Sequence, residues 1–119
     1  MNRDEFLARE VMLWHWEVHE AVPGWVERWE GWVAEDGKWR ATKWNPGKSW
    51  TQTGMILKQM EKDFFVTIRQ YDDQINQGYD VTFRKWESDD YGNAREKDFR
   101  EAIATAVARA RGWNDGNES

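Results

Sequence analysis

Apolar residues recur at three- and four-residue intervals in three parts of the chain, the spacing that places them on one face of a helix. The first part opens with an Asn and acidic residues that suit a helix start, and it stops at Pro23-Gly24. The second follows Ser49, and it contains Gly54, whose missing side chain would let a ring or a backbone approach closely. We therefore expect helices over residues 3–20, over residues 50–62 and from Asp98 to Gly112.

Elsewhere apolar and polar residues alternate with a period of two, which is typical of a strand with one buried face. Residues 64–71 and 79–86 alternate in this way, and the short polar segment 72–78 joins them as an antiparallel pair. The dipeptide Asp36-Gly37 favours a tight turn and predicts a hairpin within residues 29–42. Charged residues fill positions 87–97, where we expect a loop.

The predicted order of elements is α-β-β-α-β-β-α. It indicates the α+β class, with three helices packed on a four-stranded antiparallel sheet as a layered helix–sheet–helix sandwich. A chain of 119 residues is long enough for one domain, which we place over residues 1–113, with a flexible tail over residues 114–119. The expected core consists of Ile56, Leu57, Val66, Ile68, Val81, Phe83, Phe99, Ile103 and Val107.

Four motifs follow one another along most of the chain. They are Val11-Met12-Leu13-Trp14, Trp44-Asn45-Pro46 with Ser49, Ile56-Leu57 with Met60, and Glu101-Ala102-Ile103. In their order and spacing the chain resembles the phage ABA sandwich family of small bacteriophage and prophage accessory proteins. It departs from that family at Gly54, where the family tends to carry Trp, and in its extra tryptophans. The resemblance implies a bacteriophage origin, a layered helix–sheet–helix fold and an accessory role, and it carries over no enzymatic activity.

Tryptophan and charge are unevenly used. The chain holds 10 Trp, more than one small core needs, so some are expected at a binding surface. Its net charge is −5, with −6 over residues 1–37 and +4 over residues 38–48. An acidic chain repels nucleic acid polymers, whereas a local basic segment can hold a small phosphate-bearing ligand. The absence of cysteine excludes disulfides, thiolate metal sites and a Cys nucleophile.

The strongest candidate for binding is the basic-aromatic segment, residues 38–50, in which Lys and Arg alternate with Trp. Cations pair with phosphates, bases stack on aromatic rings, and a helix N-terminus after Ser49 offers free N–H groups to an anion. Two arginines of the later strands can join from the exposed face of the sheet. The predicted ligand-binding residues are Arg40, Lys43, Trp44, Lys48, Trp50, Arg69 and Arg84.

A structural role is the alternative for the same segment. Trp44 and Trp50 would then anchor the second helix to the sheet. The cations would solvate a strand or pair with acids such as Glu30, Glu35 or Asp80.

Metal binding and catalysis are not expected. His15 and His19 are four residues apart on the first expected helix, but a metal site would need a third ligand such as Glu20. The pairs Asp72-Asp73 and Asp89-Asp90 fit solvated loops and match no calcium-binding pattern. The chain shows no phosphate-binding loop and no Ser/His/Asp arrangement, so we predict no enzyme and no cofactor.

Three functions fit these observations. The first is a non-enzymatic phage protein that binds and sequesters a small nucleotide-type signal, as in counter-defence. The second is a protein inhibitor that blocks a host defence effector through an acidic, Trp-rich surface. The third is a homo-oligomeric accessory protein without a ligand. The charged N-terminal residues lack the apolar stretch of a signal peptide, and no apolar run is long enough for a membrane span, so we expect the host bacterial cytoplasm and no membrane partner.

Overall fold

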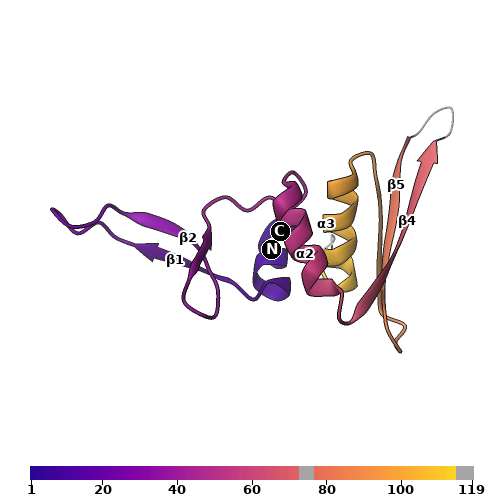
Figure 1. Ribbon diagram of the computed structural model, residues 1–119, viewed down its shortest axis with the longest axis horizontal. Coiled ribbons are helices and arrows are strands. Elements are labelled where there is room, and N and C mark those ends of the chain that lie inside the picture. The colour runs from indigo at the N-terminus through magenta and orange to yellow at the C-terminus, as the bar shows by residue number, and fades with distance from the viewer. Residues whose placement is uncertain (73–76, 115–119) are drawn as a thin grey trace.

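The computed structural model describes residues 1–72 and 77–114, which form an elongated body with a sheet toward each end and helices between them (Figure 1). Its extents are 60 × 35 × 27 Å. A short helix and a π-helical turn come first, then three strands, a helix, three more strands and a last helix. The elements are α1 (Arg3–Phe6), η1 (Leu7–Val11), β1 (His15–His19), β2 (Trp29–Val33), β3 (Trp39–Ala41), α2 (Trp50–Met60), β4 (Phe64–Asp72), β5 (Gln77–Lys85), β6 (Tyr91–Glu96) and α3 (Phe99–Ala110).

The predicted helix over residues 3–20 is wrong in its second half, which is β1. Leu13 adopts a φ of +60°, a conformation that ends the helical backbone. From Trp14 onward aromatic and aliphatic residues alternate with His and Glu, which is the period of a strand. β1 pairs antiparallel with β2, with Trp16 opposite Trp32. The helical spacing of a few apolar residues concealed this shorter alternation.

The first sheet has the strand order β1-β2-β3. The predicted hairpin within residues 29–42 is confirmed, because β2 and β3 pair around a turn in which Gly37 has a φ of +79°. β1 and β2 form a second, longer hairpin that projects from the body and ends at residues 20–28 (Figure 1). We call this hairpin the arm.

The second sheet has the order β4-β5-β6, and β6 lies within residues 87–97, where a loop was expected. The loop prediction is wrong. β6 places small residues against α3 and polar residues on the other face, so its sequence lacks the large apolar residues that usually indicate a strand. A Cβ atom at Gly92 would lie only 2.1 Å from the backbone N of Ala110, so the helix backbone packs directly on this strand. The predicted polar segment 72–78 falls partly on residues 73–76, outside the described residues.

The described chain therefore contains two separate three-stranded sheets in place of one four-stranded sheet. The predicted layered sandwich is wrong, and so is the helix–sheet–helix layering that the family resemblance implied. α3 covers one face of the second sheet, and α2 packs on α3. The predicted tail, residues 114–119, lies outside the described residues except for Asn114.

The predicted helix starts are confirmed by side-chain caps. Asn2 accepts the Glu5 N–H at 2.8 Å, Ser49 accepts the Gln52 N–H at 3.3 Å, and Asp98 accepts the Arg100 N–H at 2.9 Å. Gly54 has no heavy atom within 4 Å of a built Cβ, so the expected close approach at this residue is wrong. No helix of residues 1–72 or 77–114 is long and apolar enough to cross a membrane.

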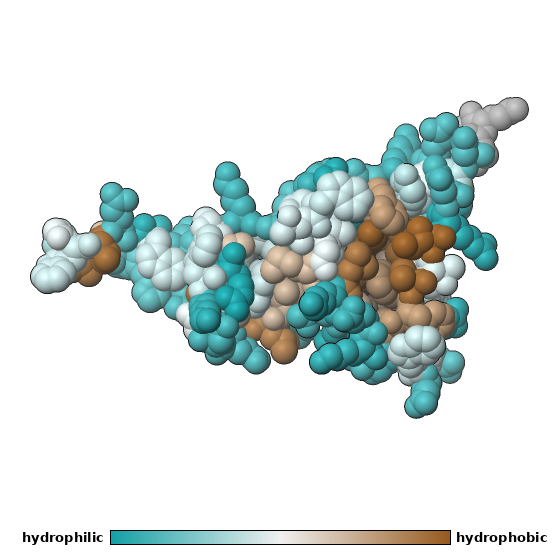
Figure 2. Space-filling model, in the orientation of Figure 1, coloured by the Kyte–Doolittle hydropathy of each residue, from teal (hydrophilic) through white to brown (hydrophobic). Residues whose placement is uncertain are grey.

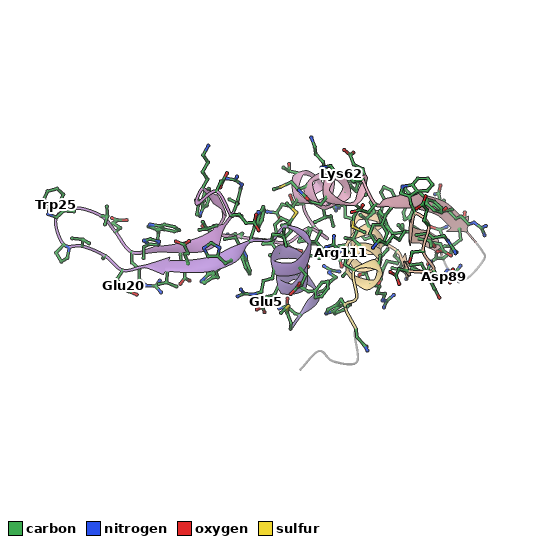
Figure 3. All side chains as sticks on the ribbon, turned by 90° about the horizontal axis from the view of Figure 1, so that it is seen from below. Glu5, Glu20, Trp25, Lys62, Asp89 and Arg111 are labelled. Atoms are coloured by element: carbon green, nitrogen blue, oxygen red, sulfur yellow. The ribbon has the colours of Figure 1, made fainter. Side chains whose placement is uncertain are left out.

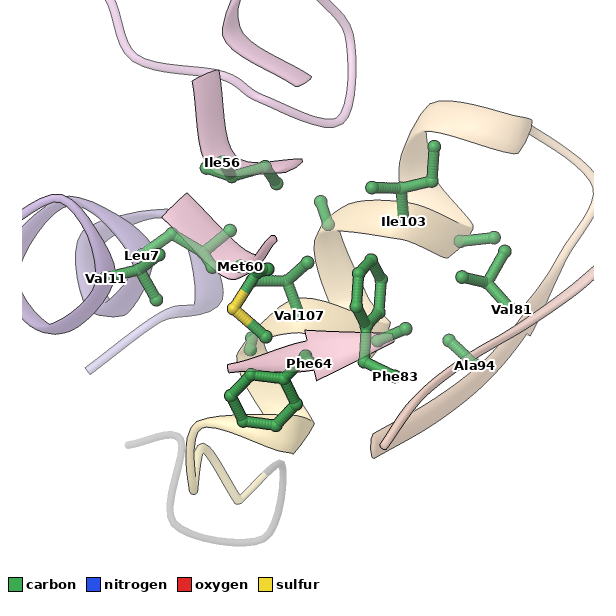
Figure 4. Close-up of a cluster of buried hydrophobic side chains, with 14 residues drawn as sticks. Leu7, Val11, Ile56, Met60, Phe64, Val81, Phe83, Ala94, Ile103 and Val107 are labelled. Atoms are coloured by element: carbon green, nitrogen blue, oxygen red, sulfur yellow. The ribbon is translucent and has the colours of Figure 1, made fainter. Parts of the chain in front are cut away.

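The main core lies between α3, α2, η1 and the second sheet (Figure 4). Most of the predicted core is confirmed: Ile56, Val81, Phe83, Ile103 and Val107 are buried, and Leu57 and Phe99 pack against them half-buried. Val66 and Ile68 were wrongly placed there, since they are 42% and 46% exposed. α3 covers β5 and β6 and leaves β4 at the uncovered edge.

Candidate ligand-binding site

One face of the second sheet is covered by none of the described helices, and we call it the open face. Val81, Phe83 and Ala94 are buried beneath α3. Because side chains alternate along a strand, their neighbours point away from the helix. These neighbours are polar, aromatic and basic, which distinguishes the open face from the core face.

The strand register arranges the open face into three rows of residues that lie side by side across β4, β5 and β6. The first row is Arg69, Asp80 and Arg95, the second is Thr67, Thr82 and Asn93, and the third is Phe65, Arg84 and Tyr91. Three arginines thus stand on one face with a single aspartate. The face is basic although the chain as a whole is acidic.

The one aspartate of the three rows is already engaged. Arg95 Nε lies 3.6 Å from Asp80 Oδ2, and the Asn93 amide donates both to Asp80 and, at 2.8 Å, to Thr82 Oγ1. Among the described residues, Arg69 and Arg84 have no ion-pair partner. Two guanidinium groups therefore remain available to an anion that lies across the Thr67–Thr82 row.

Aromatic rings border the arginines. The guanidinium of Arg95 lies 4.4 Å from the centre of the Tyr71 ring, and that of Arg84 lies 5.7 Å from the Tyr91 ring. The rings of Phe65 and Trp86 are 4.6 Å apart at the end of the third row. Tyr91 and Trp86 are 59% and 56% exposed, so flat apolar surfaces are offered to a ring-bearing ligand.

A pocket of about 260 Å³ occupies the centre of the open face. It is lined by Thr67, Arg69, Asp80, Thr82, Arg84 and Asn93. Arginine forks bind phosphate through paired hydrogen bonds, while hydroxyl and amide groups recognise sugar or base edges. The arrangement suits a phosphorylated ligand that carries a ring.

The structure separates the seven predicted binding residues, and only Arg69 and Arg84 line this pocket. Arg40 lies on β3, where its guanidinium is 2.7 Å from Asp36 Oδ2. Lys48 Nζ lies 3.7 Å from Glu101 Oε1. Two cations of the basic-aromatic segment thus have carboxylate partners, as the structural alternative requires, although the partners are other acids than those expected.

The remaining predicted residues also contact the body of the protein. Trp44 donates its indole N–H to the Asp4 carbonyl at 2.8 Å and packs edge-on against Trp14. Trp50 is exposed, and the Arg100 guanidinium lies 5.2 Å from its ring. Lys43 is exposed in the segment between β3 and α2. Trp44 therefore contacts the N-terminal helix, whereas the structural alternative expected it to anchor the second helix to the sheet, and Trp50 stands at the surface.

Sequence reasoning missed Asn93, Arg95 and Tyr91, because β6 was expected to be a loop. The signal that could have found them is the alternation within Tyr91–Glu96, where Gly92 and Ala94 separate the larger residues. Small residues at every second position are too weakly hydrophobic to stand out as a strand, yet they are what a closely packed helix requires.

The two histidines lie on one face of β1, with Glu17 between them. His19 Nε2 is 2.8 Å from Glu17 Oε1, and His15 contacts the other carboxylate oxygen. Hydrogen bonds from His19 and His15 lower the pKa of Glu17. Within the described residues no group of three or more His, Asp or Glu is arranged to hold a metal ion. Asp73, part of a predicted acidic pair, lies outside the described residues.

Comparison with protein-family models, with curated proteins and with solved structures finds no match to this chain.

Proposed function

We propose that the protein is a non-enzymatic binding protein that sequesters a small phosphorylated, ring-bearing molecule of nucleotide type on the open face of its second sheet. The bacteriophage origin that is part of this proposal rests on the resemblance of the chain's motif order to the phage ABA sandwich family. A counter-defence role in the host bacterial cytoplasm, against a nucleotide signal, is part of the proposal.

The observation that carries the proposal is a pair of arginines that have no carboxylate partner within the described part of the chain and that stand beside exposed rings. Arg69 on β4 and Arg84 on β5 stand in rows that are four residues, or about 13 Å, apart along the strands, with the row of Thr67 and Thr82 between them. Surface cations gain little from such clustering, whereas a phosphate between them gains charge-assisted hydrogen bonds. The pocket lies on a sheet face among polar side chains, which suits a ligand that is bound and released.

The proposal is tested by titrating the protein with ATP, ADP-ribose and cyclic di- and trinucleotides while tryptophan fluorescence is recorded. Trp86 borders the open face and reports directly on a ring that stacks there. We expect Arg84→Ala and Arg69→Ala to weaken binding about tenfold or more, since a hydrogen bond to a charged group contributes about 1.5–3 kcal/mol.

Arg40→Ala is the matched control, because it removes an arginine of the basic-aromatic segment from the other sheet. It should leave binding by the open face unchanged. No fluorescence change with any of these ligands would contradict the proposal. A loss of binding in Arg40→Ala alone would move the site to the basic-aromatic segment.

A protein-binding inhibitor is the second candidate, and the end of the arm favours it. Trp25 is 86% exposed there (Figure 3), and Val22 and Val26, which line the same surface hollow, are 50% and 57% exposed. Exposed tryptophans with apolar neighbours are enriched at the centres of protein interfaces. If this function holds, Trp25→Ala abolishes inhibition of the host effector without changing the unfolding temperature, while Arg84→Ala leaves inhibition intact.

A further inference from the structure

The outer edge of β4 is a strand edge without the features that normally prevent pairing. β4 pairs with β5 over all of its nine residues, Phe64–Asp72, in an unbroken register. It contains no proline and no lysine, and no described strand pairs with its other side. An edge strand that is long, regular and weakly charged is a template for another strand.

The other long strand edge of this sheet is guarded. The Arg109 side chain donates to the Asn93 carbonyl of β6 at 2.9 Å, so a side chain already occupies part of that edge. On the first sheet, β1 has only five residues and carries His15, Glu17 and His19, and β3 has only three residues. β4 is therefore the edge most suited to pairing among the described strands.

The core face of β4 adds an apolar surface to this edge. Val66 and Ile68 lie opposite the buried Phe83 and Val81 but are themselves 42% and 46% exposed. Figure 2 shows a hydrophobic patch where the second sheet emerges from beneath the helices. A strand that extended the sheet at this edge would cover both side chains.

We propose that β4 pairs antiparallel with β4 of a second copy of this chain, about a two-fold axis at Thr67. Opposite residues of paired strands point to the same side, so the two apolar faces coincide only when even-numbered residues oppose even-numbered ones. With Thr67 opposite the partner's Thr67, Val66 lies opposite the partner's Ile68. A two-fold contact is self-complementary and closed, which favours a dimer over a fibre.

The pairing of side chains favours this register over the one with its axis at Ile68. It places Arg69 opposite the partner's Phe65, whose ring accepts a cation. Moving the axis to Ile68 would place Asp72 opposite the partner's Phe64 and Val66 opposite the partner's Gln70. The Thr67 register therefore matches apolar residues with apolar ones and places a cation opposite an aromatic ring. The dimer would carry one continuous six-stranded sheet, and it does not depend on the ligand proposed above.

Single-cysteine variants test the register, because the chain has no cysteine of its own. Directly opposed residues have Cα atoms about 4.5–5.5 Å apart, within the range that a disulfide spans. Thr67→Cys should therefore form a disulfide-linked dimer under mild oxidation. Arg69→Cys is the control on the same exposed strand, since its Cα would lie about 13 Å from its copy in this register. Equal cross-linking of the two variants would overturn the proposal.

Light scattering over a concentration series tests the dimer itself. The unmodified protein should approach twice the chain mass, and Ile68→Lys should raise the dissociation constant about tenfold or more by placing a charge in the new sheet face. Val18→Lys is the matched control on β1, with an equal 46% exposure, and should leave the dimer unchanged. A monomer at every concentration, or a dimer lost in Val18→Lys and kept in Ile68→Lys, would refute the proposal. Nucleotide binding is measured separately with the Arg84→Ala protein, so either proposal can fail alone.

Discussion

At the residue scale, helix-capping residues were predicted from the sequence better than the burial of individual side chains. The caps at Asn2, Ser49 and Asp98 follow from local hydrogen bonding, which sequence records directly. The exposure of Val66 depends on which strand lies at the edge, and no local pattern records that. Ile68 shows the same limit. It belongs to an alternating pattern that is typical of a strand with a buried face, yet β4 is an edge strand and Ile68 is 46% exposed.

Replacing either of two glycines by alanine should change the free energy of unfolding, in opposite directions. Gly92→Ala should lower the free energy of unfolding by about 1–3 kcal/mol, because its Cβ would collide with the backbone of α3. Gly54→Ala should raise it by about 0.5–1 kcal/mol, since the site lies within α2 with open space around it. Chemical denaturation of both variants measures the two changes, and effects of equal sign would contradict the packing described here.

At the scale of elements, helices with strong apolar stripes were predicted and two strands were not. α2 and α3 combine a capping residue with a 3.6-residue period, and both occur where expected. β1 was hidden within a predicted helix, and β6 was hidden by its charges. The predicted pairings of β2 with β3 and of β4 with β5 are confirmed, but the second partners of β2 and β5 were missed. The candidate site was incompletely predicted for the same reason, because β6 supplies one residue to each of the three rows of the open face.

The same substitution, isoleucine to alanine, can compare a buried position in α3 with an exposed position in β4. Ile103→Ala should cost about 2–5 kcal/mol of unfolding free energy, because Ile103 is fully enclosed by the core. Ile68→Ala should cost much less in the monomer, since 46% of the residue already contacts solvent. Thermal unfolding at low protein concentration compares them, and equal losses would place Ile68 in the core after all.

An ion pair ties the N-terminal helix to α3 and makes stability depend on pH. The hydrogen bond from Arg3 lowers the pKa of Glu101, against the opposing effect of burial. A carboxylate whose folded-state pKa is lowered stabilises the fold above its ordinary pKa and loses this effect as the pH falls through the lowered value. The free energy of unfolding should therefore fall more steeply in acid for the unmodified protein than for Glu101→Gln. Parallel pH curves would show that the pair contributes nothing.

At the scale of the whole molecule, the two sheets present different surfaces toward opposite ends of an elongated body. The radius of gyration of 16.6 Å exceeds the roughly 13.5 Å expected of a compact chain of this length. The arm carries exposed Trp25, whereas the second sheet carries the arginines and aromatic rings of the open face. Composition predicted that some tryptophans would lie at a binding surface. Several are exposed, and their part in binding stays a prediction. Their division between two ends could not be predicted, because it follows from strand pairing.

Nuclear magnetic resonance of the backbone amides, recorded during titration with ATP, ADP-ribose or a cyclic dinucleotide, tests the central claim most directly. If the open face binds a phosphorylated ring, the amide signals of Thr67, Thr82 and Asn93 shift in a saturable manner, while those of Arg40 and Lys43 stay in place. Shifts confined to residues 38–50, or no shifts with any of these ligands while the protein remains folded, would contradict the assignment of the site.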